Sequence, residues 1–203
     1  GVDPREIKKI GKICANAISK MKYEGAGTIE FLYENNEFFF IEMNTRLQVE
    51  HPITEAVFGI DLVKEQINVA YGIDMSLSQK YLEPKGHAIE CRINAERLPN
   101  FSPSPGNIKE FHSPGGIGIR MDSAIYNGFR VPPYYDSLIG KLIVHADSRS
   151  MALGRLSRAL DELIIDGVYT TVDLFKDILD QADFKNGDYD IHWLEQWLSD
   201  QVQ

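Results

Sequence analysis

The sequence is poor in features that would assign it to several broad classes of protein. It has only two cysteines, Cys14 and Cys91, so it has no disulfide framework and no zinc spacing, and it suits a reducing compartment such as the cytoplasm. No apolar run approaches the roughly 20 residues that a membrane span needs. The net charge of −9 and the lack of a long basic run argue against a nucleic-acid partner.

The start of the chain also lacks features. There is no initiating methionine and no signal peptide before GVDPREI, so we expect a piece of a longer protein. The composition is ordinary for a soluble globular protein, with 43% hydrophobic and 25% charged residues. A chain of 203 residues is long enough for one large or two small domains with a sizeable core.

Helical spacing of apolar residues predicts a helix over residues 4–21. Asp3 is suited to cap this helix, and Cys14 lies on its apolar stripe as an expected core residue. The same reasoning predicts further helices over residues 52–58, 61–71, 150–165, 171–181 and 191–198. In the helix 150–165, Leu153, Leu156, Leu160, Leu163 and Ile164 are expected to face inward.

Alternating apolar and polar residues predict strands between these helices. Residues 28–33 and 38–44 flank a polar turn and should form a hairpin. Further strands are predicted over residues 87–94, 107–111, 117–122 and 129–131, and within 136–145. Hairpins followed by terminal helices indicate an α+β fold with a mainly antiparallel sheet.

The stretch 38–51, FFFIEMNTRLQVEH, is the most informative part of the sequence. After an apolar run, polar side chains recur at every second residue: Glu42, Asn44, Arg46, Gln48 and Glu50. If the strand continues through this stretch, these side chains share one face. Two carboxylates, a guanidinium and two amides in a row favour a binding site over a merely solvated strand.

The predicted hairpin brings Glu30 opposite Glu42, to within a residue of register. Like charges directly opposite each other destabilise a sheet, so a positive group should lie between them. A hard cation such as Mg²⁺, held by carboxylates and nucleotide phosphates, is suited to this position, and Asn44 can add a neutral oxygen. The competing interpretation is a solvent-exposed hairpin face with unpaired charges.

The residues that follow Asn44 leave two interpretations open. The forked donors of Arg46, together with Gln48, suit a planar anion. Alternatively, Arg46 forms a structural salt bridge to Glu50 or Glu55. Glu50 can act as a general base if its surroundings tune its pKa.

Three further features also have two interpretations. Arg92, on a strand with one apolar face, is either buried and paired with Glu90 or Glu96, or directed at a ligand anion. His51 precedes a proline and is expected to be a structural hydrogen-bonding residue rather than a catalyst. The corner 134–136 follows two prolines and is expected to be a packing corner rather than a site.

Several long segments resemble the biotin carboxylase component of biotin-dependent carboxylases, an ATP-grasp enzyme. They are FFFIEMNTRLQVEHPITEAVFGIDLVKEQI, GHAIECRINAE, SPSPG, VPPYYDSLIGKLIVH and ELIIDGVYTTVDL, in the family's order and over essentially the whole chain. The resemblance implies the C-terminal half of an ATP-grasp fold, an antiparallel sheet with helices, over residues 1–84. It implies the biotin carboxylase C-terminal domain over residues 85–203.

The resemblance implies a ligase that carboxylates biotin on a carrier protein. ATP and bicarbonate form carboxyphosphate, which decomposes to CO₂ and phosphate, and biotin that has lost its N1′ proton attacks the CO₂. On this basis Glu30, Glu42 and Asn44 bind Mg²⁺ or Mn²⁺, and both glutamates contact ATP through the metal. Leu32 and Ile191 pack against the adenine.

The resemblance also implies the residues that handle bicarbonate and biotin. Arg46, Gln48 and the backbone of Val49 hold bicarbonate, and Glu50 removes its proton. Arg46 and Arg92 stabilise developing negative charge, and Arg92 faces the enolate oxygen of biotin. The catalytic residues are then Arg46, Glu50 and Arg92.

Parts of the family pattern are not found in this sequence. Family members begin with an N-terminal α/β domain and an ATP-grasp lid with a glycine-rich loop, and no such loop precedes Glu30. We therefore expect the chain alone to bind ATP weakly and to turn over negligibly, because the phosphates would be held from one side only.

The resemblance implies several partners. They are the missing N-terminal part of biotin carboxylase, a biotin carboxyl carrier protein, a carboxyltransferase and a second copy in a homodimer, with Arg120 at the interface. The sequence ends shortly after Trp197 without a continuing linker, and on this basis we expect a free-standing subunit. Such subunits belong to acetyl-CoA or acyl-CoA carboxylases, as used in fatty acid biosynthesis. The acyl acceptor itself is chosen by another domain.

Two alternatives are another ATP-grasp ligase, such as a carbamoyl phosphate synthetase, and a non-catalytic assembly or dimerisation fragment. The segments RINAE and PPYYDS argue against the first alternative. The second would be favoured by loss of the metal carboxylates, but Glu30 and Glu42 are both present. Stabilisation by Mg²⁺ is expected for a carboxylase and not for an assembly fragment.

Overall fold

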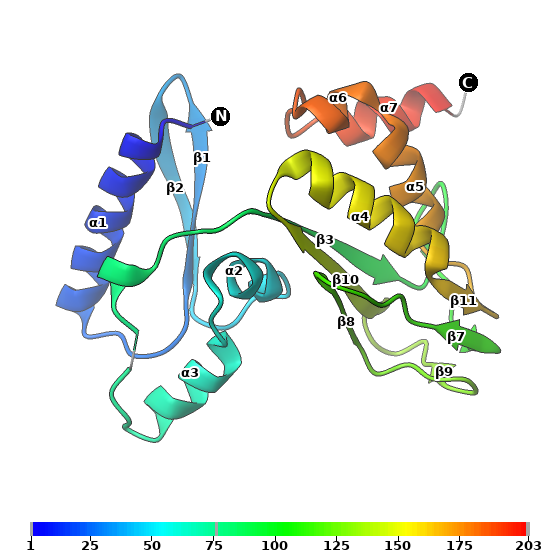
Figure 1. The fold of residues 1–203 in the computed structure, drawn as a ribbon, viewed down its shortest axis with the longest axis horizontal. Helices are drawn as coiled ribbons and strands as arrows, with labels where there is room; N and C mark the ends of the chain where they lie inside the picture. The colour runs from blue at the N-terminus through cyan, green and yellow to red at the C-terminus, as the bar shows by residue number, and fades with distance from the viewer. Residues whose placement is uncertain (1, 76, 202–203) are drawn as a thin grey trace. The chain divides into compact units, whose positions relative to one another are not determined.

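The computed structural model describes residues 2–75 and 77–201, which form two compact units, Gly1–Glu83 (unit 1) and Pro84–Gln203 (unit 2) (Figure 1). Both units combine helices with antiparallel strands, which confirms the predicted α+β class. No helix in the described part of the chain is long and apolar enough to span a bilayer.

Unit 1 consists of a long helix, a hairpin and short helices, close to the predicted ranges. They are α1 (Pro4–Met21), β1 (Thr28–Glu34), β2 (Glu37–Asn44), α2 (His51–Phe58), α3 (Leu62–Ala70) and the 3₁₀ turn η1 (Gln79–Tyr81). The Asp3 side chain caps α1 by accepting a hydrogen bond of 2.8 Å from the backbone N–H of Arg5. Gly59, with a φ of 66°, ends α2 in the left-handed conformation.

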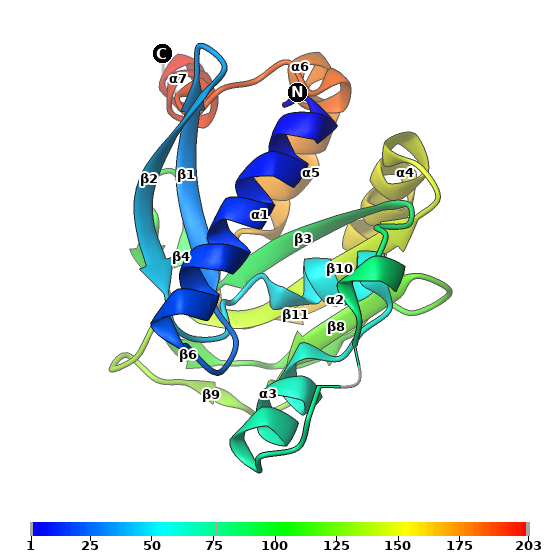
Figure 2. The same ribbon diagram turned by 90° about the vertical axis from the view of Figure 1, so that its left-hand side faces the viewer.

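The register of the β1–β2 hairpin is set by its turn. Asn35 and Asn36 both adopt positive φ angles, 50° and 63°, as a two-residue hairpin turn of type I′ requires. The strands then pair antiparallel from Glu34↔Glu37 to Thr28↔Asn44, with one irregularity between Glu30 and Phe31. Figure 2 shows the two long strands running together from this turn.

Unit 1 leaves its apolar faces largely uncovered. Helix α1 has an apolar stripe, yet none of its residues is buried. Cys14 is only half-buried, so the expectation that it belongs to a core is wrong. On the hairpin, Leu32 and Phe40 remain 51% and 64% exposed. The helix and the hairpin therefore do not form a closed core by themselves.

Unit 2 is built on a three-stranded antiparallel sheet in the order β3–β10–β8, formed by His87–Asn94, Leu138–Ala146 and Ile119–Ser123. Three small ribbons flank it: β4 (Glu96–Arg97) with β5 (Ser102–Pro103), β6 (Gly106–Asn107) with β9 (Arg130–Val131), and β7 (Glu110–His112) with β11 (Ile164–Asp166). The helices are α4 (Arg149–Glu162), α5 (Val172–Asp180), α6 (Ala182–Asn186) and α7 (Trp193–Gln201).

The core of unit 2 lies between the sheet and α4, which packs across β3 and β10 (Figure 1). The alternation of β10 directs Leu142 and Val144 into this layer, and both are fully buried. Leu156 and Leu160, one helical turn apart on α4, meet them from the other side.

Several elements of unit 2 differ from the prediction, and the strand expected over 107–111 is divided into β6 and β7. The helix expected over 150–165 ends at Glu162, because residues Ile164–Asp166 pair with β7 as strand β11. Ile164 is consequently 42% exposed rather than directed inward. Helix α6 and the short ribbon β4–β5 were not predicted, because elements of two to five residues carry little periodic signal.

Candidate functional site

Glu30 and Glu42 lie directly opposite each other on β1 and β2, where the sequence placed them to within one residue of register. The carboxamide of Asn44 bridges them: its Nδ2 donates to Glu30 Oε1 at 2.8 Å and to Glu42 Oε1 at 3.0 Å. A partially positive N–H group therefore stands where the opposed carboxylates require a positive partner. The interpretation that the charges of Glu30 and Glu42 are unpaired on an exposed face is therefore excluded.

The polar row beyond Asn44 is organised differently from the expectation. Strand β2 ends at Asn44, so Arg46, Gln48 and Glu50 do not continue its face. The chain instead bends, and Gln48 Nε2 donates to Glu30 Oε1 at 2.9 Å. Gln48 thus reaches the facing carboxylates through a turn and not by strand alternation.

Arg46 and the following turn are held by local hydrogen bonds. Arg46 donates to Asn44 Oδ1 at 3.2 Å and to the carbonyl of Leu47 at 3.3 Å. Glu50 is the N-cap residue of α2, and its side chain makes no capping hydrogen bond. His51 Nδ1 lies 2.8 Å from the carbonyl oxygen of Gln48, which is the structural role expected for it.

The residues around Glu30 fit a hard cation bound together with a ligand. Among residues 2–75 and 77–201, no three His, Cys, Asp or Glu side chains are grouped as a complete cation site. Two facing carboxylates are a partial set with which proteins hold Mg²⁺ when phosphates complete the coordination, so Glu30 and Glu42 could hold a divalent cation against a phosphate-bearing molecule. Asn44 directs its N–H at the carboxylates while its Oδ1 accepts from Arg46, so its amide would have to turn over to supply the expected oxygen.

In unit 2, Arg92 lies on β3 with its side chain exposed, so the buried alternative is excluded. Cross-strand pairing places Lys141 of β10 next to it and Asp122 of β8 beyond Lys141. Lys141 Nζ lies 3.6 Å from Asp122 Oδ2. The sequence did not point to Lys141, because its neighbours depend on the strand order.

The same part of the sheet holds Arg120, which forms a bidentate contact with Asp122 on edge strand β8, with both N···O distances at 2.8 Å. On the opposite face of β3, burial raises the pKa of Cys91 to about 12, and the charge of Glu90 adds to this shift. A thiol with this pKa is not a nucleophile near neutral pH. The chemistry of β3 is therefore carried by its polar face.

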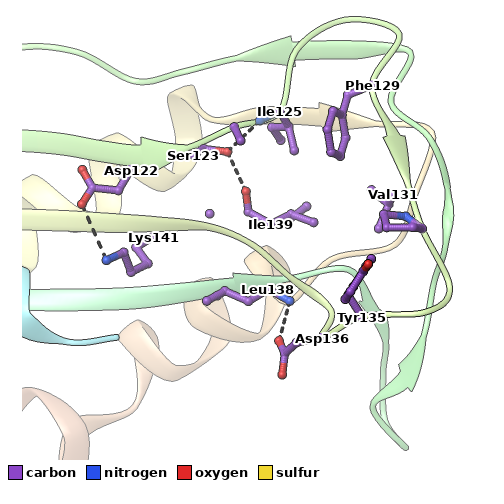
Figure 3. A pocket seen from close by; sticks show the side chains of 13 residues that line it. Asp122, Ser123, Ile125, Phe129, Val131, Tyr135, Asp136, Leu138, Ile139 and Lys141 are labelled. Carbon is purple, nitrogen blue, oxygen red and sulfur yellow. Dashed lines mark hydrogen bonds and ion pairs between the residues drawn. The ribbon is translucent and has the colours of Figure 1, made fainter. Parts of the chain in front are cut away.

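A pocket of about 320 Å³ lies at the end of this sheet (Figure 3). Its wall is mostly apolar, from Ile125, Phe129 and Ile139, while Lys141 and Asp136 provide charge. Tyr135 lines this pocket and is 82% exposed. The expectation that the corner 134–136 only packs against the protein is therefore wrong for this ring. Asp136 Oδ1 accepts the backbone N–H of Leu138 at 2.8 Å and so closes the corner.

The two predicted adenine contacts, Leu32 and Ile191, are exposed apolar residues on different units. Leu32 pairs with Phe39 on the hairpin and is 51% exposed. Ile191 is 78% exposed and lies just before helix α7. Neither side chain is used by the core of its own unit.

Comparisons with known proteins agree with this architecture. The family described as "Biotin carboxylase C-terminal domain" matches residues 90–196, and the family "Carbamoyl-phosphate synthase L chain, ATP binding domain" matches residues 1–78. A biotin carboxylase of Haemophilus influenzae is 52% identical over 198 residues, which is 98% of this chain and 44% of the relative. The chain thus spans less than half the length of this curated relative.

Solved structures show the same relationship. The biotin carboxylase domain dimer of 2-oxoglutarate carboxylase from Hydrogenobacter thermophilus, solved with MgADP, ADP and bicarbonate, is 42% identical with a TM-score of 0.93. The complex of Campylobacter jejuni biotin carboxylase named β-γ-ATP is 44% identical with a TM-score of 0.91. Each match covers 96% of this chain and 44% of the other.

The fold is that of the C-terminal half of an ATP-grasp enzyme followed by a further α+β domain. The chain belongs to the biotin carboxylase family, as the match of its C-terminal domain over residues 90–196 establishes.

Proposed function

We propose that this chain is the part of a biotin carboxylase that holds the metal, bicarbonate and biotin, in a ligase that carboxylates biotin on a carrier protein. Residues 1–84 would complete the ATP-grasp domain, and residues 85–203 would form the C-terminal domain. The observation that carries the proposal is the pair Glu30 and Glu42, which face each other and share the Asn44 amide. Like charges opposite each other destabilise a hairpin unless a positive group lies between them, and a divalent cation suits that position.

In the proposed site Glu30, Glu42 and Asn44 hold Mg²⁺ or Mn²⁺. The metal supplies charge neutralisation for the ATP phosphates when it is bound. Leu32 provides an exposed apolar surface on the same hairpin as the carboxylates, suited to a nucleobase. Ile191, also exposed, is the second residue that we assign to the adenine. The MgADP found with the related 2-oxoglutarate carboxylase domain supports this assignment.

Bicarbonate is assigned to the turn 46–50. The guanidinium of Arg46 is a forked donor that matches two oxygens of a planar anion, and Gln48 and the Val49 backbone supply further donors. Glu50 would accept the bicarbonate proton as general base, so that the resulting oxyanion attacks the γ-phosphorus of ATP and ADP leaves. The Gln48–Glu30 hydrogen bond ties this turn to the metal carboxylates.

Biotin is assigned to Arg92. Its exposed guanidinium would stabilise the enolate-like oxygen that develops when biotin loses the N1′ proton. Lys141, beside Arg92 across the strands, adds positive charge to the same face. Arg46 would stabilise the negative charge that develops on the carboxyl group. Carboxyphosphate then breaks its C–O bond to give CO₂ and phosphate, the phosphate takes the N1′ proton, and N1′ attacks the CO₂.

The proposal includes partners and a limit on activity. The 203 residues would need an N-terminal portion like that of the relatives to enclose the phosphates, and alone they should be inactive. A biotin carboxyl carrier protein and a carboxyltransferase would deliver biotin and use the carboxyl group in the cytoplasm. A homodimer through unit 2, with Arg120 on edge strand β8, is supported by the dimer described for the 2-oxoglutarate carboxylase domain. An acetyl-CoA or acyl-CoA carboxylase remains our proposed setting.

The test is ATP hydrolysis by the full-length enzyme, meaning these residues together with the N-terminal portion that relatives possess. Hydrolysis should require bicarbonate and increase with biotin. Glu42→Gln and Arg92→Ala should each lower kcat by about 10²- to 10³-fold, since each removes a positioned charge. The isolated 203-residue chain should be silent.

Two matched variants control for general damage. Glu37→Gln makes the same change on the same strand, at a position that also faces a glutamate, Glu34, but lies at the turn. Arg130→Ala removes an exposed arginine from β9. Both should keep activity within about twofold of the wild type. Hydrolysis without bicarbonate would favour another ATP-grasp ligase, and no hydrolysis by the full-length enzyme would favour an assembly role.

A further inference from the structure

Unit 2 ends in a stack of four aromatic rings, Phe184, Tyr189, Trp193 and Trp197, which we call the aromatic ladder. Phe184 stacks on Tyr189 with centroids 5.6 Å apart and on Trp193 at 6.3 Å. Trp193 and Trp197, one helical turn apart on α7, are almost parallel, with centroids 6.0 Å apart and planes at 6°. The ladder therefore joins α6, the following loop and α7, the orange and red segments of Figure 1.

Arg149 fastens the ladder to the body of unit 2. It is the first residue of α4, and its guanidinium lies over the ring of Phe184 with 5.1 Å to the centroid. It also donates to the backbone carbonyls of Phe184 and Lys185, which terminate α6. Its Nη1 lies 3.3 Å from His87 Nε2 on β3. One side chain thus connects the sheet, α4 and the aromatic ladder.

The loop between α6 and α7, residues 187–192, is folded against the ladder. Gly187 turns the chain with a φ of 81°, and Asp188 donates its N–H to the carbonyl of Asp183 at 2.9 Å. Asp190 Oδ1 accepts the N–H of His192 at 2.9 Å. Trp193 Nε1 reaches back to Asp183 Oδ2 at 3.3 Å. These bonds close the loop at both ends, while Ile191 within it stays 78% exposed.

We infer that the aromatic ladder and Arg149 are positioning residues for nucleotide binding: they hold the loop 187–192 so that Ile191 presents a fixed apolar surface to the adenine. This inference rests on the proposed function, because it takes the adenine contact of Ile191 as given. A free loop would lose conformational entropy each time a nucleotide bound, whereas a loop already ordered by the ladder does not.

The test measures MgADP binding by calorimetry and ATP kinetics in the full-length enzyme. Trp193→Leu removes the centre of the ladder together with the bond to Asp183. It should raise the Kd for MgADP and the KM for ATP by about tenfold, because each aromatic pair is worth up to about that factor. The kcat at saturating ATP and the KM for bicarbonate should stay within twofold of the wild type.

Three further variants separate positioning from general damage. Trp193→Phe keeps a ring in the stack and should restore most of the affinity. Arg149→Gln removes the guanidinium that lies over Phe184 and donates to two carbonyls, while all four rings remain. It therefore replaces Trp193→Leu in the same measurements if that variant does not fold. Tyr126→Leu removes a 63% exposed ring that contacts only Phe129 among the ring pairs in the described chain, and it should leave nucleotide affinity unchanged.

Amide hydrogen exchange of residues 188–192, without nucleotide, separates this inference from the proposed function. Exchange should become faster in Trp193→Leu and Arg149→Gln and stay the same in Tyr126→Leu. Unchanged exchange, or faster exchange with wild-type MgADP affinity, would overturn the positioning role. If the wild-type enzyme binds no MgADP, the proposed function fails, and faster exchange would still show that the ladder orders the loop.

Discussion

The two units of this chain differ in how many side chains they bury. In the described chain the buried side chains of the apolar core all lie in unit 2, most of them on the sheet, α4 and α5. In unit 1, among residues 2–75 and 77–83, only Pro52 and Glu55 are buried. Yet unit 1 carries the opposed carboxylates and the bicarbonate turn of the proposed site.

The difference shows that the polar side chains around Glu30 are ordered without an apolar core beneath them. The carboxylates of Glu30 and Glu42 are held by hairpin pairing and by side-chain hydrogen bonds, which are local. The apolar stripe of α1 and the exposed Phe40 are left without cover in this chain. Exposed apolar surface of this kind is typical of a face that packs against another part of a protein.

The largest expected effect is on stability and comes from a matched pair of substitutions. Leu142→Ala, at a fully buried position of β10, should lower the free energy of unfolding by about 2–5 kcal/mol. Leu32→Ala, on the half-exposed hairpin of unit 1, should lower it by less than about 1 kcal/mol. Urea denaturation followed by circular dichroism measures both. Equal losses would mean that unit 1 has a core after all.

The second prediction uses the two cysteines, one in each unit. Cys91 is buried, its pKa is raised to about 12, and only about one molecule in 10⁴ carries the thiolate at pH 8. Cys14 is half-buried on α1 and should be alkylated by iodoacetamide at least about 100-fold faster. Mass spectrometry of Cys14→Ser and Cys91→Ser proteins measures each site separately. Rapid modification of Cys91 in the native protein would show that unit 2 opens easily.

The smallest expected effect is a pH dependence that belongs to unit 2. Burial, aided by the charge of Arg149, lowers the pKa of His87 below its usual 6.5. The unfolded chain therefore binds a proton more readily than the folded one, so this histidine lowers stability as the pH falls below about 6.5. His87→Gln should flatten the decline of the melting temperature between pH 7 and pH 5, whereas His192→Gln, at an exposed position, should not. A steeper decline in His87→Gln would contradict the sign.

The hairpin and its acidic pair could be predicted because they are local. Two asparagines in the turn set the register as far as Phe31↔Phe40, so the sequence placed Glu30 and Glu42 opposite each other to within one residue. The irregularity between Glu30 and Phe31, which the sequence did not predict, makes them face each other directly. The placement of Gln48 could not be predicted in the same way. It returns to Glu30 through a bend after the strand ends, and strand periodicity contains no information about bends.

The sheet of unit 2 was harder to predict for a related reason. The strands that hold Arg92 and Lys141 were both expected, but nothing in their local patterns says that they are neighbours, or that Asp122 lies beyond them. Ile164 was assigned to a helix because its spacing continues that of α4, and only pairing with β7 turns it into a strand. The aromatic ladder was not expected, since its rings come from three segments.

The sequence by itself determined the α+β class, the long helix α1, the hairpin and the family, because each depends on neighbours within a few residues or on long matching motifs. Only the tertiary structure decided which strands pair in unit 2, that Gln48 returns to Glu30, and which apolar residues are buried. Those features depend on contacts between residues far apart in the chain, and local propensity cannot specify them.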